Sequence, residues 1–177
     1  GPFLPDSFAY NDEVQTPVQD INKAKELLKE AGYDENNPFT FEIVTNTGND
    51  IRINAAQILQ YQLQKSGIIM NIRVMEWQAF LNTIVHPRKF EAVLLGWSLA
   101  LMPDAYPLWH SSSAKLGGFN LVSYENKKVD ELIEKGSSTI NRDELGKIYK
   151  EIFKTINEDL PYLFLYIPDS ITVVNKD

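Results

Sequence analysis

The chain has 177 residues with 17 basic and 24 acidic side chains, and its net charge is −7. This acidic balance lacks the positive surface that nucleic acid or anionic lipid requires, so it disfavours nucleic-acid binding. The absence of cysteine excludes thiol catalysis, disulfides and zinc sites that need sulfur ligands. The two histidines, His86 and His110, are far apart in sequence, and we expect neither a metal site nor a cofactor.

The length fits one domain of common size, and we expect residues 1–177 to form a single α/β domain. No apolar run approaches the roughly 20 residues that cross a bilayer, so we expect no transmembrane segment. Residues 1–19 contain prolines and little periodicity, which predicts an extended segment that leads into the domain along its surface.

A helix is predicted after Asp20, where apolar residues recur at helical spacing over residues 21–31 and Gly32 supplies the left-handed stop. Residues 39–45 alternate with period two, which predicts a strand. Asn49 or Asp50 is then expected to cap a second helix that ends at Gly67, with a buried stripe of Ile51, Ala55, Ile58, Leu59 and Leu63.

The next predicted elements are a strand over residues 68–75, a short helix over residues 77–84 and a strand over residues 92–95. The apolar run of this last strand shows no alternation, which is typical of a strand buried on both faces of a parallel sheet. Residues 39–95 therefore read as a right-handed parallel βαβαβ unit.

The second half is rich in loops before two predicted helices, over residues 127–136 and 142–158. The longer helix carries an apolar stripe, which we expect to pack on the sheet. Strands are predicted over residues 162–167 and 170–174, and we expect them to complete the sheet.

Gly96 and Trp97 follow the buried strand and begin an aromatic loop punctuated by prolines. In open α/β sheets, ligands bind outside the carboxyl ends of the strands. The residues alone leave Trp97 and Trp109 equally compatible with core packing and with a site. Asp104 is expected to cap the turn after Pro103, and Trp109 to pack beneath the loop. Ser111 to Ser113 follow His110, but no nucleophile elbow is present, and we expect no catalysis.

Several segments resemble the family 5 extracellular solute-binding proteins, the dipeptide, oligopeptide and nickel receptors of ABC importers. They are DINKAKELLKEAGY (residues 20–33), TNTGNDIRINAAQILQYQLQKSGI (residues 45–68), Glu76-Trp77 with Phe80-Leu81, residues 96–111, Tyr124 to Asn126 with Val129-Asp130, and Glu158 to Tyr162. The resemblance implies the second, C-terminal lobe of a two-lobed periplasmic-binding-protein-like (type II) fold, with a mainly parallel sheet and helices on both faces.

The resemblance also implies a function: capture of peptides or peptide-like solutes outside the cytoplasm, without chemistry. The expected partners are the missing N-terminal lobe, the ABC permease subunits and the solute. A standalone protein-interaction domain is the alternative. The ligand-binding residues implied are Trp97, Ser98, Leu99, Ala100, Asn46, Asn49, Arg52, Trp77 and Asn120. Five of these residues could instead have a purely structural role. Asn46 and Asn49 could form a turn or a helix cap, and Arg52 could simply be solvated. Trp77 could pack a helix on the sheet, and Asn120 could order its loop.

The chain departs from the family at two ligand-contacting positions. Dipeptide and oligopeptide receptors place an aspartate three residues after the tryptophan, where it pairs with the amino group of the peptide, and this chain has Ala100 there. The dipeptide branch places an arginine near the end of the first strand, where Thr45, Asn46 and Thr47 stand here. These departures weigh against strict dipeptide specificity.

Overall fold

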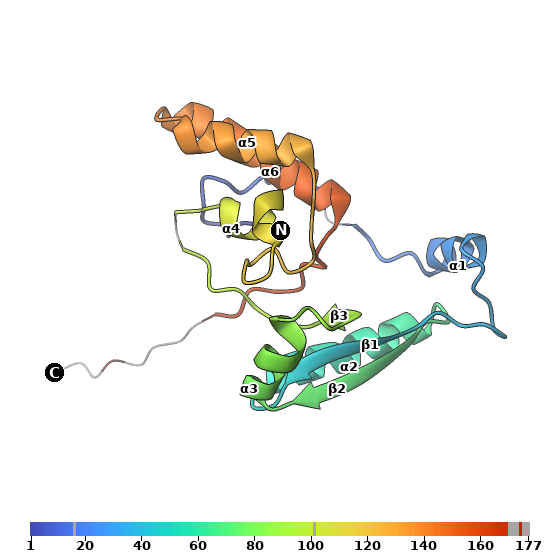
Figure 1. Cartoon of the computed structure of the whole chain (residues 1–177). Coiled ribbons are helices and arrows are strands. Elements are labelled where there is room, and N and C mark those ends of the chain that lie inside the picture. Colours follow the sequence, from blue (N-terminus) through green and yellow to red (C-terminus); the bar gives the residue numbers. More distant parts are fainter. Residues whose placement is uncertain (16, 101, 170–173, 175–177) are drawn as a thin grey trace.

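The computed structural model describes residues 1–15, 17–100, 102–169 and 174. Along the chain, the elements are α1 (Ile21–Glu30), β1 (Thr40–Asn46), α2 (Asp50–Gln64), β2 (Ile69–Met75), α3 (Trp77–Phe80), the π-helical η1 (Leu81–Val85), β3 (Ala92–Val93), α4 (Tyr106–Trp109), the 3₁₀ turn η2 (Ser111–Ala114), α5 (Lys127–Ser138) and α6 (Arg142–Asp159). Figure 1 shows the sheet with α2 and α3 in one part of the molecule and α4, α5 and α6 in another.

The sheet has the strand order β2-β1-β3, and both pairs are parallel. Ile43 of β1 lies opposite Ile72 of β2 and Ala92 of β3, so β1 is the central strand. The predicted parallel sheet with helices is confirmed for this part of the chain. The last strand is shorter than predicted: β3 ends at Val93, although Leu94 still donates its backbone N–H to the Val44 carbonyl of β1 (3.0 Å).

Helices cover both faces of the sheet, as expected. Ile43 packs with Ala56 of α2 on one face, whereas the next residue, Val44, packs with Phe80 of α3 and Ile84 of η1 on the other. Successive residues of a strand point to opposite faces, which explains why one strand contributes to two hydrophobic clusters. Val44 has no exposed surface and Ile43 only 7%.

The predicted helix caps are present. The Asp20 side chain accepts a hydrogen bond from the Lys23 N–H (2.9 Å), and that of Asn49 accepts one from the Arg52 N–H (3.0 Å). These bonds satisfy backbone donors that the first helical turn leaves free. Gly32 and Gly67 both have φ of +87°, a left-handed conformation that glycine adopts without strain.

The apolar stripe of α6 does not pack on the sheet, which corrects our expectation. Ile152 and Ile156 are fully buried in a separate cluster with Val129 of α5, Trp109 and Phe3. Residues 1–15 contain no helix or strand, and within them the Phe3 ring lies tilted against Tyr149, with 5.3 Å between the ring centres. This leading segment occupies the face of α6 that was assigned to the sheet.

Two predicted helix stripes are less buried than expected. Helix α1 has no buried residue, and Leu27 is 52% exposed. In Figure 1 this helix lies to one side of the rest of the chain. In α2, Ala55, Leu59 and Leu63 pack against the sheet, but Ile51 and Ile58 are exposed. The fully buried residue of α2 is Ala56, which packs with Ile43 of β1 and Met70 of β2.

The predicted strand over residues 162–167 is wrong. Tyr162 and Phe164 are partly buried while Leu163 and Leu165 are exposed, so the segment has the alternation of a strand. The segment packs on Trp109 and not on the sheet: the centres of the Tyr162 and Trp109 rings are 4.8 Å apart. Because no strand lies beside it, the segment forms no ladder of backbone hydrogen bonds despite its alternating burial. Of the strand predicted over residues 170–174, residues 170–173 lie outside the described residues.

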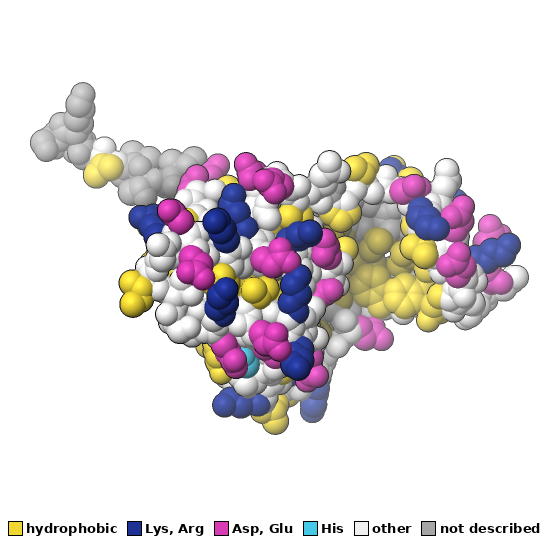
Figure 2. Space-filling model, turned by 90° about the horizontal axis from the view of Figure 1, so that it is seen from above, with side chains coloured by type: hydrophobic (Ala, Val, Ile, Leu, Met, Phe, Trp, Pro, Cys, Tyr) yellow, Lys and Arg dark blue, Asp and Glu magenta, His cyan; other side chains and the backbone are white. Residues whose placement is uncertain are grey.

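The outer face of α5 and α6 carries basic and acidic side chains side by side (Figure 2). Lys135 pairs with Glu144 at 3.6 Å, and Lys127 with Glu131 at 3.7 Å. Exposed pairs of this kind contribute little to stability, so the two helices are held mainly by their buried stripe. None of the helices in the described part of the chain combines the length and the apolar character that crossing a bilayer takes.

The buried cluster between α5, α6 and the leading segment should contribute measurably to the free energy of unfolding. Ile152→Ala should lower the free energy of unfolding by about 2–5 kcal/mol, because the buried side chain leaves a cavity. The matched control is Ile140→Ala, since Ile140 is 99% exposed and should change stability by less than about 0.5 kcal/mol. Urea unfolding of the two variants measures both values, and equal effects would contradict the assignment of the core.

Stability should also fall at alkaline pH. Burial, and next the hydrogen bond to the Asp159 carboxylate (2.6 Å), raise the pKa of the Tyr124 phenol above its usual value of 10.0. A raised folded pKa contributes stability that is complete below pH 10 and is lost as pH rises beyond it. Thermal unfolding between pH 8 and 11 should therefore depend less on pH in Tyr124→Phe than in the parent. Tyr61→Phe, at an exposed tyrosine, should keep the parent slope.

Candidate functional site

A mainly apolar cavity of about 290 Å³ opens beside the loop that follows β3. Its walls come from the leading segment, from the loop after β3 and from the region of α4, and comprise Pro2, Phe3, Leu4, Ser7, Trp97, Ser98, Leu99, Ala100, Met102, Pro103, Asp104, Pro107, Leu108, Trp109 and Phe119. Four residues predicted from the sequence, Trp97 to Ala100, therefore line one cavity together.

The position of the loop after β3 is set by hydrogen bonds at the end of the sheet. Leu94 donates its backbone N–H to the Val44 carbonyl (3.0 Å), and the Thr45 hydroxyl donates to the Leu94 carbonyl (3.1 Å). These two bonds fix the chain immediately before Gly96. Trp97 is 37% exposed and meets Phe119 edge-on at 5.9 Å, so its ring is supported on one side and open on the other.

Trp109 forms part of the cavity wall and belongs to the core. It is 2% exposed and meets the rings of Tyr124, Tyr162 and Phe164. Its indole N–H has no hydrogen-bond partner among the described residues. The tryptophan is thus held by ring contacts, which confirms the prediction that it packs beneath the loop. Asp104 caps the following turn, as predicted, by accepting the Tyr106 N–H (3.0 Å).

The wall from the leading segment was missed by sequence reasoning. We assigned residues 1–19 to the surface, but Pro2 and Phe3 are buried and both line the cavity. The available signal was the aromatic content of this segment, where Phe3, Phe8 and Tyr10 recur among prolines and polar residues. Several aromatic side chains within so short a segment are rarely all exposed to solvent.

Four other predicted residues meet at the carboxyl ends of β1 and β2, outside this cavity. The Arg52 guanidinium donates from Nη1 to the Asn46 Oδ1 (2.7 Å) and lies 5.9 Å from the centre of the Trp77 ring. Asn49 caps α2 just before Arg52. Asn46 is 7% exposed, and its amide also donates to the Thr47 carbonyl (2.7 Å).

Gly96 connects this cluster to the cavity. A Cβ atom at position 96 would stand 3.2 Å from the Arg52 Nη2, so the absent side chain leaves room for the guanidinium. The next residue is Trp97. The two groups of predicted residues are therefore neighbours. The Arg52 cluster lies at the carboxyl ends of the strands, and the cavity lies next to it, beyond Gly96.

Asn120 lies apart from both groups. It has no exposed surface, its Nδ2 donates to the carbonyls of His110 (3.2 Å) and Tyr124 (2.8 Å), and its Oδ1 accepts the Tyr124 N–H (2.9 Å). These three bonds join two loop segments and leave little amide capacity for a ligand. They are the bonds that a loop-ordering residue makes.

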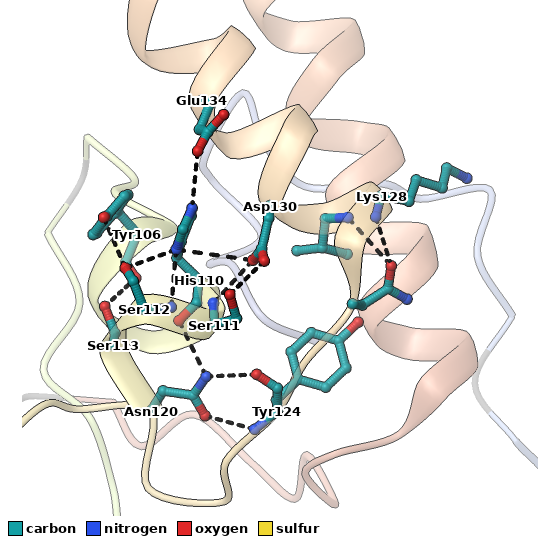
Figure 3. A network of polar contacts seen from close by, with 12 residues as sticks. Tyr106, His110, Ser111, Ser112, Ser113, Asn120, Tyr124, Lys128, Asp130 and Glu134 are labelled. Atoms are coloured by element: carbon teal, nitrogen blue, oxygen red, sulfur yellow. Dashed lines mark hydrogen bonds and ion pairs between the residues drawn. The ribbon is translucent and has the colours of Figure 1, made fainter. Parts of the chain in front are cut away.

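A polar network surrounds His110 (Figure 3). The Ser112 hydroxyl and backbone N–H both face the His110 Nδ1 (2.8 and 3.1 Å), and the Glu134 carboxylate lies 3.4 Å from Nε2. Ser111 donates to Asp130 through its N–H and its hydroxyl. Because the Ser112 N–H donates to Nδ1, that nitrogen acts as an acceptor, and the network caps η2 and ties it to α5.

The network does not resemble a metal centre or the predicted ligand site. Among the described residues there is no group of three or more histidine and carboxylate side chains placed to hold a metal ion. His110 is only 7% exposed and does not line the apolar cavity.

Comparisons with known proteins show which family the chain resembles. The model of the bacterial extracellular solute-binding proteins, family 5 (middle region), matches residues 1–119. The oligopeptide-binding protein AppA of Bacillus subtilis is 36% identical over 182 residues, covering 96% of this chain and 33% of that protein. The chain thus spans about a third of the length of this relative.

Solved structures agree as well. AppA from Bacillus subtilis in complex with a nonapeptide has a TM-score of 0.84 at 36% identity, over 94% of this chain and 36% of that one. DppA from Helicobacter pylori in complex with the peptide STSA has a TM-score of 0.76 at 30% identity, over 92% and 31%. NikZ from Campylobacter jejuni in complex with Ni(L-His) has a TM-score of 0.76 at 28% identity, over 89% and 34%.

The family model covers more than half of the chain, the described fold matches the periplasmic-binding-protein neighbours, and the predicted loop lines a cavity. The chain belongs to the family 5 bacterial extracellular solute-binding proteins.

Proposed function

We propose that this chain is the ligand-capturing C-terminal lobe of a substrate-binding protein that serves an ABC importer outside the cytoplasm. The observation that carries the proposal is the apolar cavity lined by Trp97 to Ala100, in a chain similar to the oligopeptide-binding protein AppA. The remaining lobe of such a protein would close over this cavity, and the permease subunits would receive the ligand.

Peptides are the ligand class that fits the cavity best. Its lining is dominated by aromatic and aliphatic side chains, which suit the apolar side chains of a peptide. The partly exposed indole ring of Trp97 offers a large rigid contact for such side chains. Relatives solved with a nonapeptide and with STSA support this choice, although NikZ, solved with Ni(L-His), widens the range of ligands in the family.

Catalysis is not part of the proposal. The serine and histidine that lie closest together, Ser112 and His110, are two residues apart in one turn and bond to each other as a local cap. A nucleophile needs a base that is oriented toward a bound substrate, and this pair is oriented toward the backbone of η2.

Trp97 is the residue on which peptide affinity should depend most. In a two-lobed protein that carries this chain, Trp97→Ala should weaken binding of a leucine- and phenylalanine-rich nonapeptide at least tenfold, which is about 1.4 kcal/mol. Tyr61→Ala is the control, because Tyr61 is an exposed aromatic residue on α2 away from the cavity. Calorimetric titration measures both, and equal affinities for the two variants would refute the assignment of the cavity.

The amino group of the peptide should matter little. Ala100 stands where peptide receptors of this family are expected to carry an aspartate, and no carboxylate replaces it at that position. Acetylating the amino terminus of the nonapeptide should therefore change its affinity less than threefold. Asp104 already lies in the cavity wall, where it accepts the Tyr106 N–H (3.0 Å). Ala100→Asp should make the same protein prefer the free amine, since it places a carboxylate at the position where the family carries its amine-binding aspartate.

Calorimetry with the acetylated and free peptides, run on the parent and on Ala100→Asp, gives the four affinities needed. A many-fold loss on acetylation in the parent would show that another carboxylate holds the amine.

A further inference from the structure

We propose that Arg88 is a positioning residue for the ligand cavity: its guanidinium holds the loop of residues 115–123, and through Phe119 of that loop it fixes the Trp97 ring. The inference rests on the proposed function, because it names a residue outside the cavity on which the shape of the cavity depends. Two observations on Arg88 carry it, the conformation of its backbone and the partners of its guanidinium.

The backbone of Arg88 is left-handed, with φ of +56°, just after the end of η1. Glycine is the usual residue where a helix ends in this conformation, because a side chain strains it. Two backbone bonds close the turn: the Arg88 N–H donates to the Val85 carbonyl (3.1 Å), and the Lys89 N–H donates to the Ile84 carbonyl (2.9 Å). An arginine in a conformation that suits glycine points to a role for its side chain.

The guanidinium of Arg88 binds both ends of the loop. Nη2 donates to the Lys115 carbonyl (2.8 Å), and Nη1 donates to the Ala114 carbonyl and to the Ser123 hydroxyl (3.2 Å). Ala114 ends η2, so the first two acceptors lie where the loop begins and the third lies where it ends. A planar guanidinium with five N–H donors can hold such separate acceptors at the same time. The side chain therefore ties the two ends of the loop together.

The same bonds join two parts of the molecule. Residues 40–95 contain the sheet and residues 105–164 contain α4, α5 and α6, and both ranges are described throughout. Between these two ranges, the hydrogen bonds and ion pairs all come from Arg88. Leu121 of the loop adds an apolar contact, since it is buried with Val44 and Phe80. Arg88 is thus the polar link that sets how the loop lies against the sheet.

Phe119, in the middle of the loop, extends this constraint to the cavity. Phe119 and Trp97 both line the cavity, and their rings meet edge-on at 5.9 Å. The loop is tightly folded, because a Cβ atom at Gly118 would overlap the Ser113 carbonyl oxygen. The position of Phe119 therefore follows the ends of the loop, which Arg88 holds. Loss of the guanidinium should release Phe119 and, with it, one side of the Trp97 ring.

The first test uses the 177-residue chain without ligand, and NMR follows the indole N–H signals of Trp97 and Trp77. Arg88→Gly removes the guanidinium and keeps the backbone, because glycine adopts the left-handed conformation without strain. This variant should move the Trp97 signal and leave the Trp77 signal in place. An unchanged Trp97 signal, or equal movement of both signals, would overturn the proposal. Arg73→Ala is the matched control, since Arg73 pairs with Glu42 (2.9 Å) within the sheet, and it should leave the Trp97 signal unchanged.

Phe119→Ala distinguishes an effect through the loop from a direct effect of the arginine charge on the indole. If Arg88 acts through Phe119, Arg88→Gly should add little further movement of the Trp97 signal once Phe119→Ala is present. Movement as large as in the parent background would mean that the charge acts directly, and it would refute the proposed role of the loop.

The second test measures peptide binding by calorimetry in a two-lobed protein that carries this chain. Arg88→Gly should weaken binding of the leucine- and phenylalanine-rich nonapeptide at least about fivefold, and adding it to Phe119→Ala should cause little further loss. Parent affinity in Arg88→Gly, with binding still dependent on Trp97, would overturn the proposal. Binding that does not depend on Trp97 would instead refute the proposed function, and the NMR signals would still decide whether Arg88 fixes the ring.

Discussion

The rest of the structure depends on strand β1, because it is hydrogen-bonded along both edges and buried on both faces. Its alternating side chains hold α2 on one side and α3 with η1 on the other. Its last residues then lead to the candidate site: Thr45 holds the Leu94 carbonyl, and Asn46 holds the Arg52 guanidinium. A shift of β1 by one residue would exchange its two faces and displace both contacts at once.

Local chemistry made much of the fold predictable. Asp20 and Asn49 each cap a helix through the backbone N–H three residues later, a relation that involves only neighbouring residues. The strand that becomes β1 was recognisable by its period of two. The loop of Trp97 was predicted as a site because it follows a buried strand, and the structure places Trp97 to Ala100 on one cavity.

The partners of these elements were harder to predict, because periodicity tells which face is apolar and not what covers it. The stripe of α6 was correctly identified, but its partners, Phe3 and Val129, come from distant parts of the chain. Residues 162–167 alternate as a strand does, yet a strand also needs a neighbour, and Trp109 takes that place. For the same reason, the wall that Pro2 and Phe3 contribute to the cavity could not be deduced from their own sequence.

The pairing of the leading segment with α6 has a consequence for synthesis on the ribosome. The Asn11 amide donates to the Lys150 carbonyl (3.1 Å) across 139 residues, whereas β1, α2 and β2 are consecutive. The sheet can therefore assemble while the chain is still emerging, but Phe3 and its neighbours must wait for α6. During that interval an aromatic segment stays uncovered and available to chaperones, until α6 is present to cover it.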